Sequence, residues 1–299
     1  MSPSDANFGI GALAVTERLA DIGARIDGIR QLGAVVNAMR GIAAARAQQA
    51  RGQLVAVDSY AATIAAAIAR ALALVPAARS GAAAGSSSRP AIVLFCAEQG
   101  FAGAFSERVL AAVGGDLATS ELFLIGTRGG AALAEMGHTA GWKAAMPSHS
   151  PGIPKLADRI AGALYARIAA GEIDRLDAVF SQWQPGHGTR VERRRLLPLD
   201  MTAFPQPTGA NPPLLNLPAD TLVRALSSDY IHAQLCHAAL HAFAAENEAR
   251  MQAMAATRSQ IERQLSALRA RQRLVRQEEI TAEVIELAAG ETATRSDRD

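Results

Sequence analysis

The chain has 299 residues, enough to bury a sizeable core without disulfides or metals, and its net charge of +2 is too small to indicate nucleic-acid binding. Hydrophobic residues make up 49% of the chain and aromatic residues only 4%, because alanine dominates. Alanine is the strongest helix former, so this composition favours a helix-rich protein. Cys96 and Cys236 lie far apart and outside any motif, which argues against a disulfide or zinc scaffold and predicts buried thiols.

The first 80 residues predict a long helix. Residues 1–15 are rich in glycine and alanine and weakly patterned, so we expect a flexible extension there. Apolar residues then recur at alternating spacings of four and three, the stripe of a coiled-coil seam. We predict an N-terminal coiled-coil helix over 16–80, whose helical pattern runs to about Val75. The stripe comprises Val15, Leu19, Ile22, Ile26, Ile29, Val36 and Met39.

Between residues 89 and 204 the spacing of the apolar residues is no longer that of a helix. Three short apolar runs, centred in 91–97, 122–125 and 176–181, are typical of strands buried on both faces. Helix-like stretches separate them, and this alternation predicts a small Rossmann-like α/β domain over 89–204. The stretch 189–199 is polar and then apolar, which indicates a closing strand at an edge of the sheet. The five prolines that follow predict a crossover loop over 205–218.

A second helical pattern holds without proline from 219. We predict a C-terminal coiled-coil helix over 219–290, ended by Gly290, and a disordered tail over 291–299. Neither long helix can bury its narrow stripe alone, so we expect a long antiparallel coiled coil with the α/β domain inserted between its strands. Neither contains the ~20 strongly apolar residues of a membrane span, so we expect contact with a membrane only through partners. The C-terminal stripe comprises Ile261, Leu265 and Leu268 and, after a shift, Val275, Ile280, Val284 and Leu287.

No group of residues in the sequence predicts catalysis. The turn from Gly100 to Gly103 lacks the glycine pattern and acidic follower of a dinucleotide site, and there is no phosphate-loop motif. His232, His237 and His241 share one helix, but a third ligand is missing nearby. We therefore expect helix-surface histidines, no metal and no cofactor.

Six arginines between Arg258 and Arg276 are accompanied by a single acid, Glu262. Such a run is usually a solvated basic face of a helix. The more specific interpretation is a nucleic-acid-binding surface. A long helical shaft that carries a small domain is typical of a protein with a mechanical role, and two alternatives to such a role remain open. One is an enzyme built on the α/β domain, and the other is a coiled-coil adaptor or nucleic-acid-binding protein with an α/β head.

Three stretches resemble the gamma subunits of F-type ATP synthases. RIDGIRQLGAVVNAMRGIAAAR at 25–46 looks like their N-terminal shaft. ENEARMQAMAAT at 246–257 and RQEEITAEVIELAAG at 276–290 are more specific, and their order and spacing also match. Ala34 and Asn37 stand where many relatives have lysines, and Glu98-Gln99 replaces the usual Asp-Arg, so the chain resembles a divergent bacterial member.

The resemblance implies a non-catalytic central-stalk rotor of a proton- or sodium-translocating F-type ATP synthase. Such a rotor couples ion flow in the membrane ring to conformational change in the catalytic alpha and beta subunits. The implied partners are three alpha and three beta subunits, an epsilon subunit and the membrane c-ring, without nucleic acid. The implied location is peripheral, at the cytoplasmic face of the bacterial inner membrane.

The resemblance also implies partner contacts. Glu246 and Arg250 are expected to hydrogen-bond a loop of one catalytic subunit, through charge-assisted bonds that form and release in steps. Gln277 and Thr281 are expected to contact the catalytic ring near its upper collar. Met39 is expected beside the lever segment of a catalytic subunit, with ordinary seam packing as the alternative. The full set of expected contacts is Met39, Arg40, Arg46, Glu246, Arg250, Gln277 and Thr281.

Overall fold

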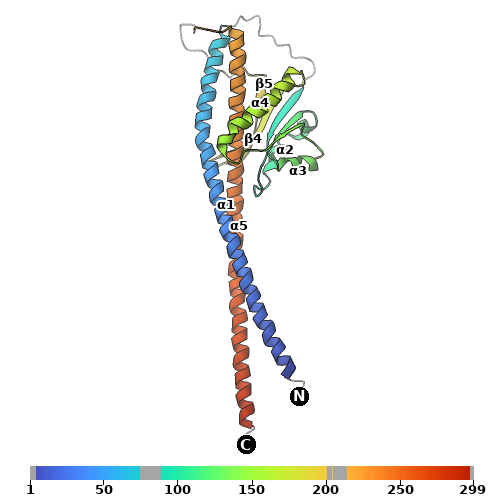
Figure 1. The fold of residues 1–299 in the computed structure, drawn as a ribbon, viewed down its shortest axis with the longest axis vertical. Helices are drawn as coiled ribbons and strands as arrows, with labels where there is room; N and C mark the ends of the chain where they lie inside the picture. The colour runs from blue at the N-terminus through green and yellow to red at the C-terminus, as the bar shows by residue number, and fades with distance from the viewer. Residues whose placement is uncertain (1–4, 75–88, 201–203, 205–213, 297–299) are drawn as a thin grey trace. The chain divides into compact units, whose positions relative to one another are not determined.

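The computed structural model describes residues 5–74, 89–200, 204 and 214–296, and side chains between 19 and 289 within these ranges. Two long helices, α1 (Asp5–Leu72) and α5 (Ala219–Ser296), precede and follow a five-stranded sheet with its own helices along the chain, as the colours of Figure 1 show. The predicted fold class is therefore confirmed. The inserted elements are β1 (Pro90–Phe95), α2 (Phe105–Ala111), β2 (Glu121–Ile125), α3 (Gly129–Glu135), β3 (Trp142–Ala144), α4 (Ile153–Ala169), β4 (Arg175–Gln184) and β5 (Gly188–Leu197), with short 3-10 helices at Gly114–Ala118 and Ser150–Gly152.

The bounds of the two long helices differ from those expected. Helix α1 begins at Asp5, inside the stretch for which an extension was expected. Helix α5 continues through Gly290 to Ser296, because one glycine costs a helix only about 1 kcal/mol relative to alanine. The expected crossover over 205–218 and the end of the expected N-terminal helix lie mostly outside the described residues.

Contacts divide the chain into two compact units. One consists of 1–40 and 254–299, and the other of 41–253. The predicted domain limits instead followed the ends of the helices, so this division differs from them. The reason is that part of each long helix packs with the sheet, as the shared clusters of buried side chains show.

The first unit is an antiparallel pair of helices, as predicted. Ile22 and Ile26 of α1 cluster with Val275 of α5, and farther along α1 Val36 clusters with Met254 and Ile261. The α5 numbers fall as the α1 numbers rise, which establishes the antiparallel direction.

The expected stripe is not buried over its whole length. Beyond Val275, the side chains of Ile280, Val284 and Leu287 are 54%, 60% and 74% exposed. The apolar period of the sequence therefore continues past the buried seam, and leaves an apolar surface on α5.

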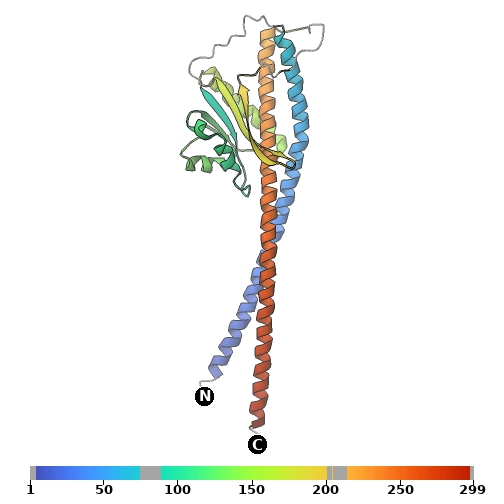
Figure 2. The same cartoon turned by 180° about the vertical axis from the view of Figure 1, so that it is seen from behind.

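The second unit contains a sheet with the strand order β3-β2-β1-β4-β5. The first four strands are parallel, and β5 pairs antiparallel with β4 at the edge, as the sequence predicted. Strand β3 was not predicted, because its three residues are at most half-buried and give no apolar run. Figure 2 shows the β4–β5 hairpin beside α5, where Arg194 of β5 donates to Gln234 of α5 over 2.9 Å.

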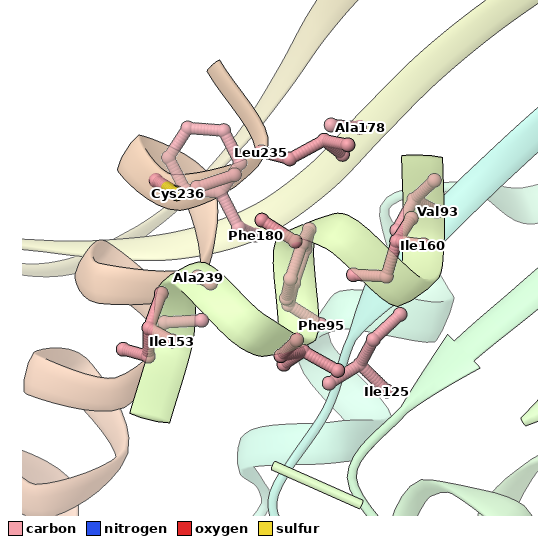
Figure 3. Close-up of a cluster of buried hydrophobic side chains, with 14 of the residues drawn as sticks. Val93, Phe95, Ile125, Ile153, Ile160, Ala178, Phe180, Leu235, Cys236 and Ala239 are labelled. Atoms are coloured by element: carbon pink, nitrogen blue, oxygen red, sulfur yellow. The ribbon is translucent and has the colours of Figure 1, made fainter. Parts of the chain in front are cut away.

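Both faces of the sheet are covered, which explains the continuous apolar run of β1. Ile92 and Leu94 point to the face covered by α2 and α3, and Val93 and Phe95 point to the face covered by α4 and the long helices. Figure 3 shows the second of these layers, with Phe95 and Val93 among side chains of β4, α4 and α5. All four side chains are fully buried.

The two cysteines are free and buried, as predicted. Cys96 follows β1, and Cys236 lies on α5 in the layer of Figure 3. Burial raises the pKa of each thiol to about 12. Both therefore remain protonated and unreactive at neutral pH.

Among the described residues, one helical stretch, from Leu19 to Leu72 in α1, is long and apolar enough to cross a membrane by length and composition alone. Buried helices of soluble proteins pass the same test. Here the inward positions are alanines and isoleucines, including Ala47, Ala50 and Ile68, which are fully buried. Packing within the second unit thus buries part of this stretch, and 28% of its most apolar window is buried.

Two histidines of α5 that were expected on the helix surface are instead packed against β4. The ring centroids of His237 and His241 lie 6.0 Å and 5.9 Å from that of Phe180, and 4.4 Å from each other. His237 also lies 3.3 Å from both Asp58 and Arg194. Burial is the main cause that lowers the pKa of both imidazoles to about 4, and the charge of Arg194 contributes to the shift of His237. Both histidines are therefore neutral in the folded chain.

We expect the isolated chain to lose stability as the pH falls below about 6.5. Between pH 6.5 and about 4 the unfolded chain binds protons that the folded chain does not, so the free energy of unfolding decreases. At pH 5 the loss should be on the order of 2 kcal/mol for the buried His237 and smaller for the less buried His241, whose charge is partly screened by solvent, measured by urea denaturation at pH 7.5 and pH 5. The variant His241→Gln should flatten this dependence, whereas His149→Gln, at an exposed site, should preserve it. An equally steep profile in both variants would contradict the assignment.

Candidate functional site

The loop after β1 lies at the carboxyl end of the parallel strands. In open α/β sheets this edge, at the point where the strand order reverses, is the usual place for a ligand. Strand β1 lies between β2 and β4, so the reversal falls at its end, where the chain passes through Cys96 and Gly103 to α2. Two residues of the loop have positive φ angles, Phe101 at 62° and Gly103 at 59°.

Two charged side chains of α5 hold this loop. Glu246 and Arg250 form an ion pair one helical turn apart, and are 3% and 4% exposed. The Glu246 carboxylate accepts hydrogen bonds from the backbone N–H groups of Glu98 and Gln99, each over 3.1 Å. Arg250 donates to the carbonyl oxygens of Gly100, over 3.1 Å, and Gln99, over 3.3 Å. The pair thus satisfies both donors and acceptors of the loop backbone.

A third charged side chain ties the loop to its neighbours. The Glu98 carboxylate accepts from the backbone N–H of Thr127, after β2, over 3.1 Å, and from that of Met146, after β3, over 2.9 Å. The Thr127 hydroxyl also donates to Glu98. One side chain therefore links the carboxyl ends of three parallel strands.

This arrangement does not suit a nucleotide. Two carboxylates, Glu98 and Glu246, stand at the edge where a dinucleotide fold places its pyrophosphate, and both would repel it. The backbone N–H groups that would bind the phosphate are already bound to these carboxylates. The charged side chains around the loop instead fix its backbone within the chain, and we call the Glu246–Arg250 pair with its bonds to this backbone the clamp.

A second charged cluster joins β4 to β5 and joins this hairpin to the 3-10 helix at Gly114–Ala118. The buried carboxylate of Asp177 accepts from Arg193, over 2.7 Å, and from Arg195, and Arg193 also pairs with Asp116 over 2.6 Å. Burial alone would raise the pKa of Asp177, but its bonds to the two arginines hold that pKa below its usual value. Arg175 of β4 also pairs with Asp177, over 3.4 Å. The role of the cluster is to fix the hairpin.

The structure brings three of the expected contact residues together. Arg46 of α1 donates to the Gln99 side chain over 3.4 Å, so it meets the same loop as Glu246 and Arg250. That buried pair is bound to the backbone of the loop, to Asn247 and to itself. Their expected bonds to another subunit thus remain a hypothesis.

The other four expected residues belong to the helix pair of the first unit. Met39 packs against the cluster of Val36 and Ile261, which agrees with its alternative interpretation as a seam residue. Arg40 is partly exposed. Gln277 and Thr281 are exposed and stacked one turn apart, with the Thr281 hydroxyl donating to the Gln277 carbonyl over 2.8 Å.

Sequence reasoning missed the roles of Glu98 and Phe101. Glu98 was noticed only as a departure from a family pattern, and its partners lie 29 and 48 residues away, so local spacing carries no signal for them. Phe101 has a positive φ angle and is 67% exposed, which is unusual for a large aromatic residue. The flanking glycines marked a turn but not its conformation.

Comparison with known proteins gives a consistent result. A family model described as ATP synthase matches residues 18–294. The ATP synthase gamma chain of Frankia casuarinae is 26% identical over 295 residues, which cover 91% of this chain and 96% of the relative. That of Lachnoclostridium phytofermentans is 28% identical over 221 residues, which cover 70% and 76%.

Solved structures share the fold. A chain from the Euglena gracilis mitochondrial ATP synthase superposes with a TM-score of 0.63 at 12% identity, covering 95% of this chain and 97% of that one. A chain from the central stalk and c-ring structure of the Tetrahymena thermophila enzyme gives a TM-score of 0.55 at 15% identity, covering 75% and 99%. At these identities the likeness concerns the fold.

Proposed function

Because this chain belongs to the ATP synthase gamma-chain family and is a central-stalk rotor subunit, we propose that it couples ion flow to conformational change in a bacterial F-type ATP synthase. The observation that carries the proposal is the family match over 18–294, which spans both long helices and the sheet. The ion is a proton or a sodium ion. This subunit itself forms no covalent bond in the reaction. The proposed partners are three alpha and three beta subunits, an epsilon subunit and a membrane c-ring.

The mechanism is a coupling free energy delivered through packing. An asymmetric helix pair presents a different surface to each catalytic subunit, so each orientation favours a different conformation in each subunit. The basic run on α5 supports close contact with acidic segments, because charge attraction is screened over about 8 Å at physiological salt. Part of that run is paired locally, as Arg258 contacts Glu262 and Asn37, which fits a protein-facing surface better than a nucleic-acid site.

The end of α5 offers the surface for the catalytic ring. Gln277 and Thr281 are exposed polar residues, and the exposed side chains of Ile280, Val284 and Leu287 lie on the same helix. Apolar area of this kind on a helix marks a protein interface. We assign Gln277 and Thr281 to the contact with the collar, and the apolar side chains to the surface around it.

A second surface suits the partners nearer the membrane. A hollow of about 520 Å³ in the second unit is lined mainly by alanines of α1 and by leucines in and just before α5, with Thr63 and Arg70 among its lining residues. Leu214 and Leu217 beside the start of α5 are also exposed. We assign this surface to the epsilon subunit or the c-ring, which would place the chain peripherally at the cytoplasmic face of the inner membrane.

Purification of the complex tests the proposal. Affinity-tagged chain expressed in its own host is expected to copurify with alpha and beta subunits, and the assembly is expected to hydrolyse ATP. An intact, coupled ATPase purified from that host without this chain would refute it.

Substituting both polar residues of the proposed collar contact gives a sharper prediction. We expect Gln277→Ala combined with Thr281→Ala to lower coupled ATP synthesis about three- to tenfold, the effect of losing one or two interfacial hydrogen bonds. The melting temperature of the isolated chain should not change, because both side chains are exposed. Gln49→Ala, an equally exposed glutamine on α1, serves as the control. Synthesis at the unsubstituted rate in the double variant would remove both residues from the contact.

A further inference from the structure

Arg51 of α1 is held between two other elements of the second unit. Its guanidinium donates to the Glu248 carboxylate of α5 over 3.2 Å, and lies over the Trp183 ring of β4 at 4.7 Å from the ring centroid. The Glu248 side chain is 7% exposed, whereas that of Arg51 is 37% exposed. One side chain of α1 therefore contacts both the other long helix and the sheet.

The apolar surroundings of this pair offer little resistance to sliding of one helix along the other. The buried positions of α1 between 41 and 53 are Ala43, Ala47 and Ala50. On α5 the stretch that contains Glu248 is also rich in buried alanine. Alanine lets helices approach closely, but its single methyl group is a shallow knob that interlocks weakly with a facing helix. Directional polar contacts must therefore fix much of the register.

A second polar contact joins the same two helices, between Asp58 and His237 over 3.3 Å. It is the weaker of the two, because the His237 imidazole is neutral in the folded chain and the Asp58 side chain is 56% exposed. The contacts of Arg51 are more demanding. A slip of α1 by one residue would move Arg51 by about 1.5 Å along the helix, so its guanidinium could no longer meet both Glu248 and Trp183.

We propose that Arg51 is a positioning residue, whose contacts with Glu248 and Trp183 fix the register of α1 against α5 and β4, so that the three elements bear load as one body. The mechanical consequence rests on the proposed function, because a rotor subunit is loaded along its helices. The register itself does not rest on that function, since it can be measured on the isolated chain.

A variant that removes both charges at once tests the proposal. Arg51→Met combined with Glu248→Met leaves no buried carboxylate unpaired, and replacing a buried ion pair by apolar residues of similar size is often neutral or stabilising. The melting temperature should therefore not fall. Arg167→Met combined with Glu121→Met is the control, because Arg167 also pairs with a carboxylate, over 2.9 Å, and lies over an aromatic ring, but joins α4 to β2.

The register is measured as the distance between spin labels on Ser59→Cys of α1 and Gln252→Cys of α5, both at exposed positions. The two native thiols are buried and protonated, so they do not compete for the label. In the double methionine variant the distance distribution should broaden by about 1.5 Å or more, the rise of one residue. It should keep its width in the control and in Arg51→Lys, which retains a charged donor. An unchanged width in the double methionine variant would overturn the proposal.

In the assembled complex, the double methionine variant should lower coupled ATP synthesis at a limiting ion gradient about threefold, the effect of losing one hydrogen bond from the coupling free energy. Hydrolysis of ATP without an ion gradient should keep the rate of the unsubstituted complex, because no opposing load then acts on the helices. An equal loss of both activities would show a general weakening of the fold, and would also overturn the proposal.

The outcomes distinguish this proposal from the proposed function. If the unsubstituted chain enters no complex, the proposed function fails, while the distances between the labels still decide the register. If the complex assembles and makes ATP, and the double methionine variant broadens the distances without slowing synthesis, the proposed function stands and the role of Arg51 under load fails.

Discussion

Replacing Glu246 by alanine is expected to lower the free energy of unfolding of the isolated chain by about 3 to 5 kcal/mol. The substitution leaves Arg250 charged in a buried site and removes the acceptor of two backbone N–H groups. Urea denaturation followed by circular dichroism measures the loss.

The same helix supplies a matched control. Arg258 and Glu262 form an ion pair with the same spacing of four residues, but their side chains are 46% and 60% exposed. Glu262→Ala should therefore cost less than about 0.5 kcal/mol, the usual contribution of a solvated pair on a helix. Similar losses in the two variants would show that the Glu246 site is hydrated, and would contradict the clamp.

Replacing Gly126 by alanine is expected to destabilise the chain by at least about 4 kcal/mol, or to prevent folding. Gly126 follows β2 with a φ angle of 95°, and a Cβ there would lie 2.3 Å from the carbonyl oxygen of Cys96 and 2.8 Å from that of Ala97. These are backbone atoms of the two residues that directly follow the central strand β1, so they cannot move aside as a flexible side chain can.

Gly114 separates the two causes of this effect. Its φ angle is 57°, but a Cβ there would have no atom within 4 Å. Gly114→Ala should therefore cost only the backbone strain, about 1 to 2 kcal/mol. The difference between the melting temperatures of the two variants measures the steric clash at Gly126, and equal melting temperatures would refute it.

The fold was predictable because its main patterns are local. The run AIVLFCA at 91–97 indicated a strand buried on both faces, and the structure places alternate residues of β1 in two separate layers. The antiparallel pairing followed from two stripes too narrow to be buried alone. Strand β3 was not predicted from the sequence. Its three residues, with the exposed Lys143 in the centre, form neither an apolar run nor a clear alternation.

The candidate site was only partly predictable. Glu246 and Arg250 were selected because of a family motif, but a motif does not reveal whether a charge is exposed or buried. Their burial depends on the loop from Glu98 to Gly100, nearly 150 residues earlier in the chain. The histidines of α5 show the same limit, because helical spacing placed His237 and His241 on one face without indicating that β4 covers it.

The alanines of α1 have a mechanical consequence. Ala43, Ala47 and Ala50 are buried at successive turns of the helix, with at most 1% of their surface exposed. Alanine has no rotamers to exchange, so a load on this buried face of the helix cannot be relieved by rearranging these three side chains. Deformation must instead be taken up by the helical hydrogen bonds, which recover their length when the load is removed. This stretch of α1 should therefore behave as a spring with little internal friction, and return stored twist instead of dissipating it as heat.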